Sequence, residues 1–392
     1  MIMKNTKTLK YSKLAALATL AIGSATAGAQ TTSAIKFYGS IDLGAAYSTN
    51  GSRGGAGTTQ IGSGVLRPSL FGLQGLEDLG GGLKAVFQVE AGFDADTGAM
   101  KTYSGNPSTA TPAAPGGLPV NGLFNRRAYV GLQGAFGSLT LGRDYTPIYW
   151  AALDGDALSL TTYGNLQESV LLSGTGTDRY GRASNAIFYA SPEIGAWLVR
   201  AMYSAGSESG GGAGAPPAAA NRMLAASLKY SNGGLVLTGV YQQVALPRVA
   251  GTPLAFTGAT GKRKDESVAA RYNFERWALT TGYLRIQQPT ASDTDASAYW
   301  LGATAKLGSG KVHANYIRMR QRVATGPAQT GDVFGLAYIY PLSKRTSLYS
   351  SYGRLENSAN ATFALVSADT SVAPGSAGAG IKALALGMQH SF

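Results

Sequence analysis

The side chains that carry out most enzymatic chemistry are scarce in this chain of 392 residues, which contains no cysteine and two histidines, His313 and His390. A nucleophilic serine needs a histidine within hydrogen-bonding reach, and a transition-metal site needs histidines or cysteines at ligand spacing. Here His313 follows a tight turn and His390 lies in an alternating segment at the chain's end, so neither has an evident partner. The sequence therefore predicts no enzyme, no cofactor and no metal site.

The charged residues are scattered along the chain. It carries 33 Lys and Arg against 21 Asp and Glu, a formal net charge of +12. The basic residues do not cluster with aromatic side chains as nucleic-acid binding would require. The glycine-rich stretch GSRGGAG (51–57) lacks the Lys-Ser ending of a phosphate loop, so it is interpreted as an external loop. Neither nucleic acid nor nucleotide is an expected partner.

Side chains alternate between two chemical classes along segments of about ten residues, which indicates β-strands that face two different surroundings. In the final segment, Leu384, Leu386 and Met388 share one face, and the interleaved residues are small or polar. Tilted strands of this length span a lipid bilayer. Similar segments are 35–47, 83–93, 197–204, 268–274 and 299–307, and their polar faces include Lys36, Asp42, Lys84 and Glu90 as predicted lumen-facing residues.

The connections between these segments alternate between tight turns and long loops. The seven tight turns are 75–82, 134–138, 191–195, 231–234, 273–276, 307–310 and 341–345. The eight long loops lie near 49–64, 94–122, 146–178, 206–222, 246–263, 289–294, 323–330 and 358–380. These connections require sixteen antiparallel strands. Because lipid offers the backbone no hydrogen-bond partners, such strands must close into an all-β transmembrane barrel, here wide enough for an aqueous lumen.

The first 29 residues read as a cleaved signal peptide. Four lysines precede the apolar stretch 14–22, and small residues at 27–29 form a cleavage site. Residues 30–392 are then the barrel domain, and loss of the four lysines lowers the formal net charge to about +8. No part of this domain has the run of apolar residues that a transmembrane helix needs.

Several longer motifs resemble the general porins of Gram-negative bacteria, in the version common in β-proteobacteria. They are YGSIDLG (38–44), FGLQGLEDLGGGLKAVFQVEAGF (71–93), FNRRAYVGLQGAFGSLTLGRDYTPIY (124–149), GRASNAIFYASPEIG (181–195) and GMQHSF (387–392). The resemblance implies a homotrimer of sixteen-stranded barrels in the outer membrane, among lipids and lipopolysaccharide. It implies short periplasmic turns, long extracellular loops and passive diffusion of small hydrophilic solutes and inorganic ions. It also implies that the barrel-assembly machinery reads the terminal Phe392.

The resemblance places a pore constriction at a third loop that folds into the barrel, here about residues 148–178. In the family, acids of this loop lie across the gap from a ladder of arginines on the barrel wall. The corresponding acids are Asp154, Asp156, Glu168 and Asp178. A transverse field between the two rows of charge is the expected consequence.

Two arginines match ladder positions of the family, Arg126 in FNRR and Arg182 in GRASN. Arg143 in GRDYTP matches a basic residue at the base of the third loop. The strand alternation also allows Arg127 to point inward, so the choice between it and Arg126 stays open.

Two wall positions that are usually basic in the family are neutral here. Leu70 stands where a third arginine precedes FG, and Gln74 stands where a lysine is common. A positive lumen lowers the barrier for anions, and the two missing charges reduce that effect. We therefore expect weak anion selectivity.

Two other functions remain open. Trp150 and Tyr163 in the third loop are compatible with a substrate-specific channel, and a surface β-protein could bind a ligand through its loops. The run KRKDE (262–266) is interpreted as a solvated charge run, with a contact to lipopolysaccharide phosphates as the alternative.

Overall fold

The computed structural model describes residues 34–51, 57–101, 103–104, 119–120, 122–167, 181–206, 222–245, 262–287, 295–323 and 325–392. The predicted signal peptide lies outside these residues. Among those described, strands dominate, and the one α-helix is α1 (Pro147–Gly155). No helix in the described part of the chain has the length and apolarity to cross a bilayer.

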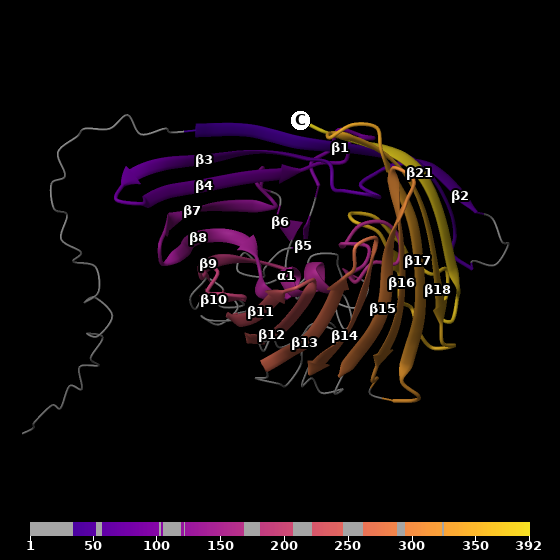
Figure 1. Cartoon of the computed structure of the whole chain (residues 1–392). Coiled ribbons are helices and arrows are strands. Elements are labelled where there is room, and N and C mark those ends of the chain that lie inside the picture. Colours follow the sequence, from indigo (N-terminus) through magenta and orange to yellow (C-terminus); the bar gives the residue numbers. More distant parts are fainter. Residues whose placement is uncertain are drawn as a thin grey trace, which may run out of the picture.

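Sixteen strands form a closed ring in which each strand pairs antiparallel with its two neighbours (Figure 1). In ring order they are β1 (Ala34–Thr49), β3 (Leu70–Gly80), β4 (Leu83–Gly92), β7 (Arg127–Gly134), β8 (Gly137–Tyr145), β9 (Arg182–Ala190), β10 (Trp197–Ser204), β11 (Met223–Asn232), β12 (Leu235–Ala245), β13 (Lys262–Asn273), β14 (Trp277–Gln287), β15 (Ala296–Leu307), β16 (Gly310–Gln321), β17 (Gln329–Pro341), β18 (Thr346–Asn357) and β21 (Ile381–Ser391). Because β21 returns to β1, the ring leaves no open sheet edge. The predicted sixteen-stranded antiparallel barrel is confirmed.

Five short strands lie outside this count. β2 (Thr58–Ser63) continues the sheet beside the second half of β1. The pairs β5 (Tyr103–Ser104) with β6 (Pro119–Val120) and β19 (Leu365–Val366) with β20 (Ser371–Val372) are small two-stranded units within loops.

The last residue closes the ring. The Phe392 and Gly39 backbones exchange two hydrogen bonds, each 3.1 Å long. The Phe392 ring also packs on Phe37, with 5.6 Å between ring centroids. A Cβ at Gly39 would lie 2.2 Å from the Phe392 ring, so the close approach requires glycine at this position.

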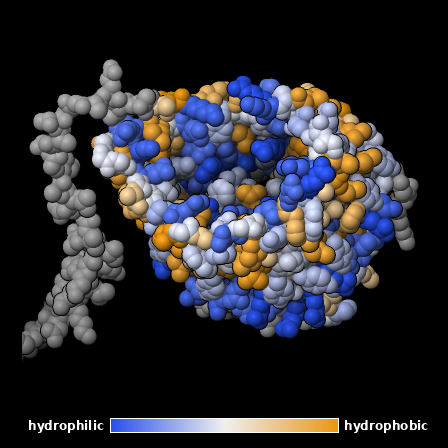
Figure 2. Space-filling model, in the orientation of Figure 1, coloured by the Kyte–Doolittle hydropathy of each residue, from blue (hydrophilic) through white to orange (hydrophobic). Residues whose placement is uncertain are grey.

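The two faces of the ring have opposite polarity. Outward side chains such as Val130, Leu141 and Leu301 are more than half exposed on the described chain. Hydrophilic residues surround the hollow at the centre of the ring (Figure 2). Lys84 shares its face of β4 with Glu90, which lines the lumen. The alternation read from the sequence therefore corresponds to a lipid-facing and a water-facing side.

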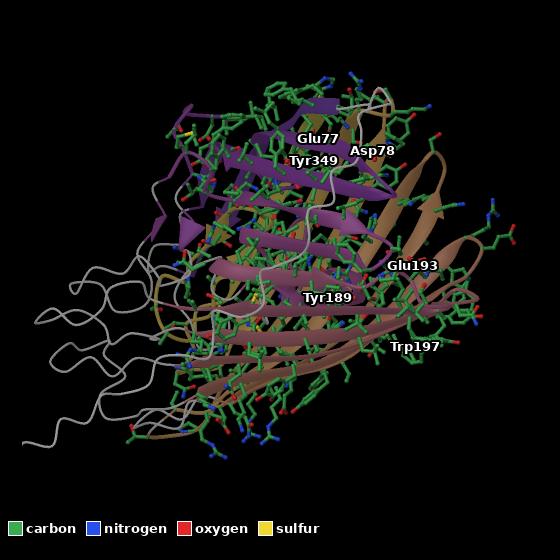
Figure 3. All side chains as sticks on the ribbon, turned by 90° about the vertical axis from the view of Figure 1, so that its left-hand side faces the viewer. Glu77, Asp78, Tyr189, Glu193, Trp197 and Tyr349 are labelled. Carbon is green, nitrogen blue, oxygen red and sulfur yellow. The ribbon has the colours of Figure 1, made fainter. Side chains whose placement is uncertain are left out.

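The tight turns gather at one end of the barrel. Asp78, Glu193 and Trp197, which lie in or beside two different turns, are all directed toward that end (Figure 3). Stacked rings lie there too: Phe274 and Trp277 have centroids 3.6 Å apart across the β13–β14 turn. Such rings suit a membrane–water boundary because they combine an apolar body with a polar edge.

Candidate functional site

The described part of the third loop, residues 146–167, lies inside the lumen as expected. Its helix α1 begins with Pro147 directly after Thr146, a position where the missing proline N–H costs no helical hydrogen bond. At the other end of the helix, the Gly155 carbonyl accepts a hydrogen bond from Trp300 Nε1 on β15 at 3.0 Å. The Asp154 carboxylate lies 2.7 Å from Lys229 Nζ on β11. These contacts hold α1 against the β11–β15 wall.

The turn after α1 is built around Asp156, which is fully buried. Its carboxylate accepts the backbone N–H groups of Leu158, Leu160 and Leu166 at 2.8–3.1 Å, together with Asn315 Nδ2 at 3.1 Å. Burial raises the pKa of Asp156 to about 6, although these donors favour the charged form and oppose the shift. Asp156 therefore fixes the path of the third loop.

His313 supplies a further tether for this turn. Its Nδ1 lies 2.8 Å from the Ala157 carbonyl oxygen, so the ring carries its proton on Nδ1 if it donates this hydrogen bond. This partner comes from the third loop, distant in sequence. The histidine thus has a structural contact that its surroundings in the sequence do not reveal.

Two wall arginines share one tyrosine. Arg126 Nη2 and Arg182 Nη2 both donate to the Tyr145 hydroxyl oxygen, at 2.6 and 2.7 Å. Arg126 Nε also donates to Glu90 Oε1 at 2.7 Å, and Tyr38 donates to Glu90 Oε2 at 2.9 Å. This network holds two guanidinium groups side by side and partly neutralises one of them with a carboxylate from the wall itself.

The other two arginines are engaged elsewhere. Arg127 forms two hydrogen bonds with Asp144, at 2.7 and 2.8 Å, in a separate cavity behind α1. Neighbouring residues of a strand point to opposite faces, but Arg126 lies before the first residue of β7 and does not follow this rule. Arg126 and Arg127 therefore both point into the barrel. Arg143 is buried and donates to the Asn125 carbonyl at 2.9 Å and to Ser184 Oγ at 3.1 Å, without lining the gap.

A short inward segment interrupts the strand beside β1. The first part of β1, Ala34–Ser40, pairs with β3, and a later part, Leu43–Ser48, pairs with β2. Between β2 and β3, residues 64–69 project into the lumen. We call residues 64–69 the lumen insertion. Asp42 fixes it, since its Oδ2 accepts the backbone N–H groups of Leu66 and Arg67 at 2.8 and 2.5 Å.

Asp42 is itself held by the opposite end of the chain. Tyr349 on β18 donates to Asp42 Oδ1 at 2.7 Å, and the carboxylate is fully buried. The predicted lumen-facing aspartate is thus on the lumen side but covered by the insertion. The side chain of Arg67, by contrast, is exposed and forms no ion pair with the described carboxylates.

A cavity of about 570 Å³ separates the wall from the third loop, and we call it the eyelet cavity. Its charged lining residues are Lys36, Arg67, Arg126, Arg182, Glu90 and Asp369. The two carboxylates have cationic neighbours, since Glu90 pairs with Arg126 and Asp369 Oδ2 lies 3.7 Å from Lys101 Nζ. Among the described residues, four cations and two carboxylates line this gap, so their net charge is positive.

The remaining sequence-based candidates have other positions. Leu70 lines the eyelet cavity, and Gln74 and Lys84 do not. Asp154 and Asp156 anchor the third loop to the β11–β16 wall, away from the arginines. Glu168 and Asp178 lie outside the described residues. Within the described ranges, no group of three or more His, Asp or Glu side chains is placed to hold a metal ion.

Sequence reasoning missed Arg67 and Asp369, which line the eyelet cavity, and Tyr145, whose hydroxyl accepts hydrogen bonds from Arg126 and Arg182. The signal for Arg67 is its place three residues before Leu70, where the ladder arginine is absent. The sequence alone does not show that the sheet beside β1 is interrupted between β2 and β3, which is what brings Arg67 to the cavity.

Known proteins share this architecture over nearly the whole chain. The family model described as "Gram-negative porin" matches residues 14–360. "Outer membrane porin protein 32" of Delftia acidovorans is 28% identical over 383 residues, covering 96% of this chain and 99% of that protein. An outer membrane porin protein of Bordetella pertussis is 28% identical over 373 residues, covering 83% of this chain and 89% of that protein.

Solved structures agree with these sequence relatives. The structure titled "Anion-selective porin from Comamonas acidovorans" superimposes with a TM-score of 0.73 and 26% identity, over 92% of this chain and 100% of that one. A trimer form of OmpT from Vibrio cholerae gives a TM-score of 0.62 at 16% identity, over 92% and 99%, which supports the fold alone.

Proposed function

Because this chain belongs to the Gram-negative porin family, whose members reside in the outer membrane, we propose that it forms a water-filled channel with a weak preference for anions. Small hydrophilic solutes and inorganic ions pass through it by diffusion. The extracellular end carries the long loops, and the periplasmic end carries the tight turns.

One observation carries the anion preference: in the described part of the chain, four cationic side chains and two carboxylates line the eyelet cavity. Charges at the narrowest point of a pore control selectivity, because the low-dielectric wall concentrates their field. The preference is weak because Glu90 offsets Arg126 at 2.7 Å. The anion selectivity named for the Comamonas acidovorans relative supports the same sign.

Arg67 compensates for the neutral residue at position 70. Its guanidinium reaches the same cavity from the lumen insertion, which Asp42 holds in place. The arginine ladder of this channel is therefore Arg67, Arg126 and Arg182, with Lys36 as a fourth positive group.

We also propose that the barrel works as a homotrimer among outer-membrane lipids and lipopolysaccharide, and that the barrel-assembly machinery recognises Phe392. The trimeric form of the Vibrio cholerae structure supports the oligomer at the level of the fold. The position of Phe392 at the seam of the ring supports its role in assembly.

Solute entry into liposomes tests the channel function. Purified protein is reconstituted, and swelling is measured with an uncharged hexose, a carboxylate and an ammonium compound of similar size. We expect all three to enter, the anion fastest and the cation slowest. Entry of one sugar alone would favour a substrate-specific channel. No entry with folded protein would instead favour a surface β-protein that binds a ligand through its loops.

A further inference from the structure

A second cavity lies at the periplasmic side of the third loop, outside the constriction proper. It has a volume of about 480 Å³, is open to solvent on one side, and is lined by the start of β16, the β17–β18 turn, the end of β21 and the third loop. We call it the vestibule cavity. Its titratable lining residues are Arg67, Lys311, His313, Lys344 and Arg345.

Among the described residues, no aspartate or glutamate lines the vestibule cavity. This distinguishes it from the eyelet cavity, where Glu90 and Asp369 offset part of the positive charge. Lys311, Lys344 and Arg345 form no ion pair with any described residue. All three side chains are exposed, so salt screens their charges in part, and their positive potential acts on the cavity without a neutralising partner among the described residues.

Hydroxyl groups complete the set of donors. Ser159 contributes from the third loop, Ser309 from the β15–β16 turn and Ser347 from β18, whereas the Thr161 hydroxyl donates to the Leu158 carbonyl. A tetrahedral dianion needs many N–H and O–H donors around several oxygens, whereas a chloride ion or a single carboxylate needs few. The mixture of cations and hydroxyls therefore fits a phosphate group better than it fits a monovalent anion.

The two cavities adjoin along the solute path. Arg67, Ser159, Thr161 and Ser391 line both of them. An anion leaving the eyelet thus meets a second positive site before it reaches the periplasm, with Arg67 in contact with both. This arrangement gives the channel a binding step as well as a selective gap.

We propose that the vestibule cavity is a binding site for phosphate dianions, free or carried by small phosphorylated solutes. The proposal rests on the proposed channel function, because the site is read out through the current that passes it. Lys311, Lys344 and Arg345 provide the unpaired charge, and Arg67 passes the ligand between the cavities. Occupancy by phosphate narrows the path and reduces the chloride current.

The test measures single-channel chloride current while inorganic phosphate is added to the periplasmic side. We expect a voltage-dependent block at millimolar phosphate. The triple variant Lys311→Gln, Lys344→Gln and Arg345→Gln should raise the half-blocking concentration by about tenfold, because three charged contacts are lost. A matched control removes equal charge at Lys262, Lys264 and Arg285 on β13 and β14, outside the cavity, and should leave the block unchanged.

Three outcomes would overturn the site. They are the absence of phosphate block in the wild type, an equal loss of block in both triple variants, and an unchanged block in the Lys311, Lys344 and Arg345 variant. Each can be recognised while chloride current and its selectivity persist, so they are distinct from a failure of the channel function. Heat-modifiable migration on gels establishes that every variant is a folded barrel.

Discussion

At the scale of single residues, the positive charge of the eyelet comes from side chains with very different supports. Arg126 and Arg182 are buried and share the hydroxyl of Tyr145. Arg67 is exposed and stands on a segment held through backbone contacts to Asp42. The paired arginines therefore shape the wall, and Arg67 is the charge most available to a passing ion.

Replacing Arg67 by glutamine should weaken anion preference without harming the barrel. One of four eyelet cations is lost, so we expect the chloride-to-potassium permeability ratio to fall roughly twofold. Reversal potentials in a potassium chloride gradient give this ratio. Arg285→Gln, on β14 and outside the cavity lining, is the control and should keep the wild-type ratio. An unchanged ratio in the Arg67 variant would remove this residue from the ladder.

Replacing Asp42 by alanine should act on both stability and selectivity. The backbone N–H groups of Leu66 and Arg67 and the hydroxyl of Tyr349 would lose their acceptor. Each buried donor left without a partner costs about 1–3 kcal/mol. We expect a lower temperature of gel-shift unfolding together with a reduced permeability ratio, because the insertion no longer holds Arg67. Wild-type stability of this variant would contradict the role of Asp42 in holding the lumen insertion. Tyr349→Phe removes one of the three donors and should lower the unfolding temperature by less.

At the scale of elements, the third loop is held by contacts that are distant in sequence. Asp154 pairs with Lys229 on β11, and Asp156 receives Asn315 from β16. Gly155 could not carry a side chain, because its Cβ would lie 2.6 Å from that of Ala269. Asp154 and Asp156 thus anchor the loop, and the carboxylate paired with Arg126 is Glu90 on the barrel wall.

The buried carboxyl of Asp156 makes loop docking sensitive to pH. Its pKa in the folded loop is about 6, above the ordinary value of 3.8, so the folded loop binds the proton more tightly. Docking is therefore most stable below about pH 4 and loses that stability as pH rises through about 6. Open-channel current noise, a measure of loop motion, should fall between pH 7 and pH 4.5. In Asp156→Asn, the current noise should no longer change with pH over this range. The same pH dependence of the noise in both proteins would contradict the role of Asp156.

The strands and turns could be predicted from the sequence, and the site only in part. Strand alternation has a period of two and is local, so segments such as 83–93 reveal their faces directly. The lumen insertion breaks that local rule, which is why Arg67 was missed. The prediction that Asp156 faces the gap was wrong. The path of a long loop depends on partners that are distant in sequence, here Asn315, and the local sequence does not show them. The choice between Arg126 and Arg127 could not be made because Arg126 precedes its strand.

At the scale of the whole molecule, the pairing of β21 with β1 closes the ring, and Phe392 extends this seam by one residue. Phe392 exchanges two backbone hydrogen bonds with Gly39 and packs on Phe37. Since a barrel in lipid tolerates no open edge, the seam affects the entire ring. The Phe392 ring lies so close to Gly39 that a side chain at this position would collide with it, so the contact needs glycine.

Deleting Phe392 or changing Gly39 to valine should therefore reduce the yield of folded barrel. The deletion removes the closing hydrogen bonds, and the valine would collide with the Phe392 ring. Heat-modifiable gel migration after detergent refolding measures closure without assembly factors. Phe392→Tyr keeps the ring and should fold normally. Normal refolding of the valine variant would contradict the importance of the close contact between Gly39 and Phe392. If the deletion variant fails to fold only in cells, Phe392 acts through the assembly machinery alone.

The reversal potential of the wild-type channel in a potassium chloride gradient of about tenfold tests the central claim most directly. The positive eyelet predicts a potential of the sign set by chloride, of modest size, and larger at low salt, where charges act over a Debye length of about 10 Å or more. A potential of the sign set by potassium would contradict the account, because it would mean that carboxylates and not Arg67, Arg126 and Arg182 control the gap.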